Sequence, residues 1–149
     1  MDSQRRQTAQ AAAGMADDVL VSLQQHLNTI PPGAEIGVVL TLPGICVTGR
    51  MVSAETWAAA AADLADAGAG AGQPSEVARY LRQIAEPWTR SRQVAESEDD
   101  AGSVDVPQFV HLLGAQFLSG GALLPGVGMP WRGRLDNVAG WSYGLMCSE

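Results

Sequence analysis

The sequence predicts an α+β domain in which helices pack on a curled, antiparallel, small barrel-like sheet. Apolar residues near the N-terminus recur at helical spacing, whereas residues 36–42 alternate as in a strand. Strand-like segments lie at both ends of the expected core, without the strand–helix alternation that is typical of a parallel sheet. We therefore expect one domain over residues 15–149, with an N-terminal helix and a helical insertion, after a flexible extension over residues 1–14.

The N-terminal helix is indicated by four apolar residues at four-residue spacing, Met15, Val19, Leu23 and Leu27. The Pro31-Pro32-Gly33 segment that follows cannot continue a helix, so the helix is expected to end there.

A β-hairpin is expected next, from strands over Glu35–Leu42 and Ile45–Val52. Pro43 and Gly44 suit the two central positions of a type II turn, because proline presets φ at the first and glycine tolerates positive φ at the second.

A helical insert is expected from about residue 53 to residue 94. Ser53 is a suitable N-cap for its first helix, and the glycines between residues 68 and 72 are expected to break that helix. Pro74 is expected to open a second helix, which Pro87 is expected to kink or end.

An acidic loop is expected over residues 95–106. Four of its carboxylates, from Glu98, Asp99, Asp100 and Asp105, are candidate ligands for a divalent cation. Their spacing does not match an EF-hand, so a solvated loop is the preferred interpretation. We expect neither a metal site nor a cofactor.

The C-terminal third is expected to return to strands. The three segments are Phe109–Leu118 with a bulge at Gly114, Trp131–Leu135 and Trp141–Met146, joined by a Gly- and Pro-rich loop over Ser119–Pro130 and a turn over Asp136–Gly140.

Charge and composition argue against several classes of partner. The net charge is −7, whereas nucleic-acid binders usually carry a basic surface, so nucleic acid is an unlikely partner. No secretion signal and no apolar run long enough to span a bilayer is visible, so we expect a cytoplasmic protein. The two cysteines, Cys46 and Cys147, are expected to be reduced thiols.

The two histidines are the first candidates for chemistry. His26 is expected at the solvent edge of the first helix. His111 lies within an expected strand, where a packed, hydrogen-bonded histidine is favoured over a catalytic base, because no neighbouring residue supplies a nucleophile or carboxylate.

An arginine- and tryptophan-rich set of residues is the candidate partner-binding surface. Alternation along residues 131–135 separates the arginines from the tryptophan, and both residue types are favoured at binding hot spots. The alternative is a purely structural role, in which the tryptophans belong to the core and the arginines are solvated. The candidates are Arg50, Trp131, Arg132, Arg134, Trp141 and Tyr143.

These segments, in this order, resemble the gas vesicle accessory protein U family. The similar segments are Leu40–Leu42, Val47–Trp57, Phe109–Leu112, Trp131–Leu135, Val138–Trp141 and Tyr143–Gly144. The resemblance implies a cytoplasmic, non-enzymatic protein that associates with gas vesicles and takes part in their assembly or clustering. Its implied partners are the vesicle shell or other gas vesicle accessory proteins, and a homo-oligomer is possible.

Two other functions stay open at this point. A small barrel of the Sm or SH3 type can bind RNA or protein, and Arg50, Arg132 and Arg134 are the candidate contacts for RNA. A small enzyme that uses His111 with a nearby carboxylate is the second alternative.

Overall fold

The computed structural model describes residues 16–70, 72–97 and 105–145. The predictions for the extension over residues 1–14, for most of the acidic loop, for Met146 and for Cys147 lie outside these residues. The elements in order are helix α2 (Asp18–Thr29), strands β1 (Ile36–Leu42) and β2 (Ile45–Met51), helices α3 (Ala54–Gly68) and α4 (Glu76–Ser97), strands β3 (Phe109–Ser119) and β4 (Ala122–Arg134), a 3-10 turn (Leu135–Asn137) and strand β5 (Gly140–Tyr143).

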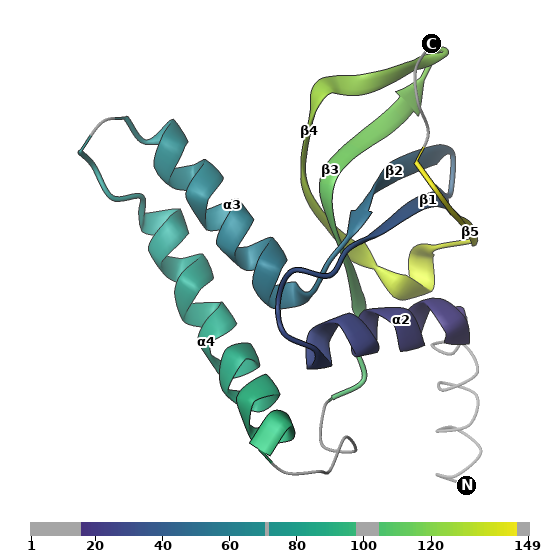
Figure 1. Cartoon of the computed structure of the whole chain (residues 1–149). Helices are drawn as coiled ribbons and strands as arrows, with labels where there is room; N and C mark the ends of the chain where they lie inside the picture. Colours follow the sequence, from purple (N-terminus) through teal and green to yellow (C-terminus); the bar gives the residue numbers. More distant parts are fainter. Residues whose placement is uncertain (1–15, 71, 98–104, 146–149) are drawn as a thin grey trace, which may run out of the picture.

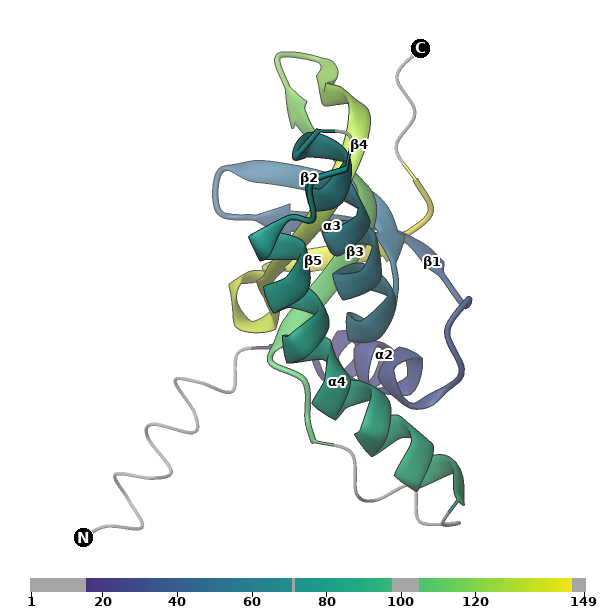
Figure 2. The ribbon, with the colours of Figure 1, turned by 90° about the vertical axis from the view of Figure 1, so that its left-hand side faces the viewer.

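The predicted α+β class is confirmed. The five strands form one antiparallel sheet in the order β4-β3-β2-β1-β5, with α2 under one end and the α3–α4 hairpin beside it (Figures 1 and 2). The expected barrel is wrong, because the sheet is open. Closure requires the two edge strands to pair with each other, and in the described residues the short strand β5 pairs with β1 while β4 pairs with β3.

The β1–β2 hairpin forms as predicted. Leu42 pairs with Ile45 across the turn, and Gly44 has a φ of +80°, which a type II turn needs at this position. Val38, Leu40 and Val47 are fully buried and belong to the core between the sheet and α2. This alternation of buried and exposed residues is what fixes the register of the hairpin.

Strand β4 corrects the sequence prediction. The expected loop over Ser119–Pro130 is a tight turn at Gly120 and Gly121, followed by strand from Ala122 onward. Glycine and proline suggested a loop, but β4 is an edge strand, where a missing backbone N–H is tolerated. Pro125 and Pro130 can therefore lie in this strand.

The predicted bulge at Gly114 is confirmed. Its φ is +62°, and the β3–β4 register shifts between Leu112 and Ala115. The two strands approach each other tightly here, since a Cβ atom on Gly128 would lie 2.3 Å from the carbonyl carbon of Gly114. Two glycines are thus required for β4 to pass over the bulge.

The helical insert forms a hairpin of two helices over residues 54–97. Ser53 caps α3 as predicted, with its Oγ accepting from Thr56 N–H at 3.1 Å. Helix α4 begins two residues after Pro74 and continues to Ser97. Of the kink or end expected at Pro87, the end is therefore wrong, and residues 95–97, which were expected in the acidic loop, are helical. Its C-terminal half is held by tertiary contacts of Trp88 and Arg92, which offset the hydrogen bond that Pro87 cannot donate. None of the described helices combines the length and apolar character needed to cross a bilayer.

Gln24 joins α2 to the end of the sheet. Its side chain is fully buried; its Oε1 accepts from the backbone N–H of His111 at 3.1 Å, and its Nε2 donates to the carbonyl of Val52 at 2.9 Å and to Asn28 Oδ1 at 3.0 Å. Val52 also donates its own N–H to the carbonyl of His111 at 3.0 Å. The amide of Gln24 therefore completes the β2–β3 ladder where β2 ends and the chain turns into α3.

We expect Gln24→Met to destabilise the fold strongly. Methionine keeps the length and helix propensity of glutamine, but it leaves a buried N–H and a buried carbonyl without partners. The free energy of unfolding, measured by urea denaturation, should fall by about 2–6 kcal/mol. The exposed neighbour Ser22 provides the control, because Ser22→Ala should change stability by less than about 0.5 kcal/mol. Equal effects of the two substitutions would contradict the role assigned to Gln24.

Candidate functional site

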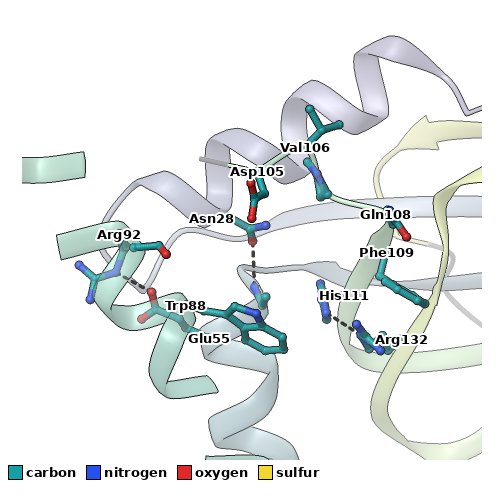
Figure 3. Close-up of a pocket in the computed structure, with 13 residues that line it drawn as sticks. Asn28, Glu55, Trp88, Arg92, Asp105, Val106, Gln108, Phe109, His111 and Arg132 are labelled. Carbon is teal, nitrogen blue, oxygen red and sulfur yellow. Dashed lines mark hydrogen bonds and ion pairs between the residues drawn. The ribbon is translucent and has the colours of Figure 1, made fainter. Parts of the chain in front are cut away.

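A pocket opens where the three helices meet the first half of β3. Its volume is about 270 Å³. Asn28 of α2, Glu55 of α3 and Trp88 of α4 line it on the helical side, and His111 of β3 and Arg132 of β4 line it on the side of the sheet (Figure 3). The pocket therefore lies at the joint that Gln24 completes, since the backbone of His111 is part of that joint.

Arg132 and His111 point toward each other across the β3–β4 pair (Figure 3). The Nε–H of Arg132 donates to His111 Nε2 at 3.1 Å, so Nε2 is an acceptor and the ring proton of the neutral histidine lies on Nδ1. The guanidinium carbon also lies 3.7 Å from the centroid of the Phe109 ring, in a cation–π contact. Two contacts thus fix the direction of Arg132.

His111 is a buried, neutral histidine. It packs against Trp57 and Trp88, with ring centroids 5.4 and 6.2 Å away. Burial, with a smaller contribution from the charge of Arg132, lowers the pKa of His111 to about 3. A histidine with this pKa is a poor general base at neutral pH. In the described part of the chain, Nδ1 of His111 and Nε1 of Trp57 have no hydrogen-bond partner.

A nearly buried ion pair forms the helical wall of the pocket. Arg92 of α4 bonds to Glu55 of α3 at 2.8 Å and to Glu96 at 2.9 Å. The hydrogen bond to Glu55 is the main cause that raises the pKa of Arg92, against the effect of burial. Asn28 accepts from the backbone N–H of Ala54 at 2.9 Å, which ties α2 to the start of α3. The wall is therefore held by polar contacts between all three helices.

The three arginines singled out from the sequence have different surroundings. Arg50 lies 3.9 Å from Glu35, and Arg134 pairs with Asp136. Arg132 makes no ion pair with a carboxylate among the residues that the structure describes, and desolvation lowers its pKa. An arginine remains charged under such conditions. Arg132 is thus a cation in a pocket, directed by a histidine and a phenylalanine.

The aromatic candidates do not gather on one hairpin. The segments around Trp131 and Trp141 were expected to be strands joined by a turn, but they lie on the two edge strands of the sheet and do not pair with each other. The 3-10 turn at Leu135 carries the chain from one edge to the other, with Leu135 and Val138 buried. Both tryptophans are partly buried against the core, whereas Tyr143 is exposed.

Several contacts of the site could not be found from the sequence. Trp88, Arg92 and Glu55 belong to the insert, for which no candidate site residue was proposed from the sequence. Only the ion pair between Arg92 and Glu96 has a local signal, because these residues are four apart on one helix. The exposed His26 does not reach the pocket lining. In the ranges that the structure describes, no three His, Cys, Asp or Glu side chains are grouped to hold a metal ion.

We expect the burial of His111 to make stability depend on pH below neutrality. Above about pH 6.5, the ordinary histidine pKa, the ring is neutral in both states, so burial carries no protonation cost. Below it, the unfolded chain binds a proton that the folded chain does not bind until about pH 3. Stability should therefore fall as the pH falls, by up to about 1.4 kcal/mol per pH unit from this group.

Urea unfolding at several pH values between roughly pH 7.5 and pH 5 tests this expectation. Most Asp and Glu side chains stay ionised in this range, so their protonation contributes little to the slope. His111→Gln removes the titrating ring, so the slope of stability against pH should become shallower, whatever the offset caused by lost packing. An unchanged slope would show that the folded protein protonates His111 at its ordinary pKa.

The comparisons with known proteins identify the family. A family model described as gas vesicle protein GvpU-like matches residues 17–146, which include the helices, the sheet and the pocket. No curated protein and no solved structure matches the chain. The resemblance inferred from the strand segments is therefore confirmed over nearly the whole length, and the chain belongs to the gas vesicle protein GvpU-like family.

Proposed function

We propose that this chain is a non-catalytic accessory protein that associates with gas vesicles and takes part in their assembly or clustering. In this proposal, the pocket around Arg132 takes up a carboxylate side chain of a gas vesicle shell protein or of another accessory protein. Membership of a gas vesicle-related family supports the kind of partner. The structure of the pocket supports the chemistry of the contact.

The observation that carries the proposal is the state of Arg132. Its Nε is occupied by His111, which leaves the terminal NH₂ groups without a carboxylate among the described residues. Because the guanidinium is planar and weakly hydrated, it binds a carboxylate through two parallel hydrogen bonds. Its contacts with Phe109 and His111 hold it in place, so little side-chain freedom is lost on binding.

The rest of the pocket is compatible with a small acidic group. Its volume of about 270 Å³ suits one or two side chains, and Trp88 and Phe109 supply aromatic walls. Glu55 is ion-paired with Arg92, which also pairs with Glu96. Asp105 also lines the pocket, but within the described chain it forms no ion pair with Arg132.

We expect Arg132→Gln to reduce binding to purified gas vesicles by at least about tenfold, because a partly desolvated charged contact is lost. The fraction of protein that floats with the vesicles during centrifugation measures the binding. A melting curve confirms that the variant is folded, since loss of the hydrogen bond to the buried Nε2 of His111 should cost no more than about 1–3 kcal/mol. Arg132→Lys should recover part of the binding, because it restores the charge without the paired hydrogen bonds.

Arg134→Ala is the matched control. Arg134 lies on the same strand, two residues away, and is already neutralised by Asp136. Its loss should leave flotation unchanged. Normal flotation of folded Arg132→Gln protein would rule out the pocket as the contact surface.

A further inference from the structure

Helix α4 carries an apolar stripe that the described part of the chain leaves exposed. Val77, Tyr80 and Ile84 are 60%, 64% and 37% exposed, and Val94, further along the same side, is 49% exposed. The first three repeat at intervals of three and four residues, which places them on one side of a helix. The stripe from Val77 to Ile84 covers 7 residue steps, or about 10 Å of helix, and Val94 lies ten residues beyond it.

The opposite side of α4 already has a partner. Ala78 is fully buried, and Arg82 and Arg92 form ion pairs with residues of α3. Viewed down the helix axis, the mean direction of these three side chains differs from that of the stripe by more than about 90°. In Figure 2, α3 and α4 lie side by side in front of the sheet. The stripe is therefore a second face, and no described element packs against it as α3 packs against the first.

The charges beside the stripe indicate what covers it. Glu76 and Arg90 lie along the same edge of the stripe, at positions seven residues to either side of Gln83, and all three are exposed. In an antiparallel pair of identical helices centred on Gln83, Glu76 of each copy lies opposite Arg90 of the other. In the same alignment, Tyr80 of one copy and Ile84 of the other differ in height along the helix axis by only about 3 Å.

We propose that α4 pairs with α4 of a second copy of this chain, in an antiparallel, two-fold symmetric contact along this stripe. In a parallel pair, residues at this edge face positions five residues further along the partner helix, here Leu81 and Ala95, so only the antiparallel arrangement sets Glu76 against Arg90. A two-fold contact buries the same stripe on both copies and closes at two. This inference does not rest on the proposed vesicle contact.

The test uses the full chain and sedimentation velocity over a series of protein concentrations. The wild type should show a concentration-dependent dimer, and Tyr80→Lys should raise the dimer dissociation constant by at least about tenfold, because it places a charge in the centre of the contact. Val127→Lys on β4 is the control, since Val127 is another exposed apolar residue, and it should leave the constant unchanged.

A charge exchange tests the orientation. Arg90→Glu should weaken the dimer by about three- to tenfold, because the introduced carboxylate of each copy then lies against Glu76 of the other. The double variant Glu76→Arg, Arg90→Glu should recover it. Within one chain, this double variant loses the ion pairs of Glu76 with Arg79 and of Arg90 with Glu86, so recovery must come from contacts between copies.

A wild type that is monomeric at every concentration would overturn the proposal and leave the stripe to a different protein. A dimer that survives Tyr80→Lys, or one that Val127→Lys disrupts equally, would also overturn it. Failure to recover in the double variant would reject the antiparallel alignment. Vesicle flotation of Tyr80→Lys should still depend on Arg132, which separates this result from the test of the pocket.

Discussion

The side chain of one buried glutamine holds the helical and sheet parts of this domain together. Strand β2 ends at Met51 because the chain must turn into α3, and this leaves the backbone of Val52 and His111 incompletely paired at the end of the ladder. Gln24 supplies the missing acceptor and donor from α2. A glutamine can do this because its amide offers both functions at the end of a flexible stem, and both are satisfied here in a fully buried place.

The pocket inherits its geometry from that joint. With the backbone of His111 fixed on one side by Gln24, its ring is directed to the other side, between Trp57 and Trp88, where burial keeps it neutral. A neutral ring can accept a hydrogen bond from Arg132, whereas a protonated ring would repel it. The position of one guanidinium group thus depends on a chain of contacts that begins on α2 and crosses the sheet.

Local signals in the sequence were sufficient for part of this structure. The β1–β2 hairpin, the Ser53 cap and the Gly114 bulge depend on neighbouring residues, and each was predicted correctly. Residues 122–130 of strand β4 were missed, because their glycines and prolines favour a loop unless the strand lies at an edge, and strand order is a property of the whole sheet. The link from Gln24 to His111 spans 87 residues and has no periodic signature. Arg132 could be selected by residue type alone, but its difference from Arg134 depends on tertiary neighbours.

The prolines of β4 have a consequence for how copies of this chain can assemble. A sheet with two free edges offers a route to open-ended growth, in which one edge of each molecule adds to the other edge of the next. Here the long edge contains Pro125 and Pro130, which have no N–H to donate to an added strand, and the opposite edge, β5, is only four residues long. In the described part of the chain, both edges therefore resist the strand-by-strand addition that builds fibres.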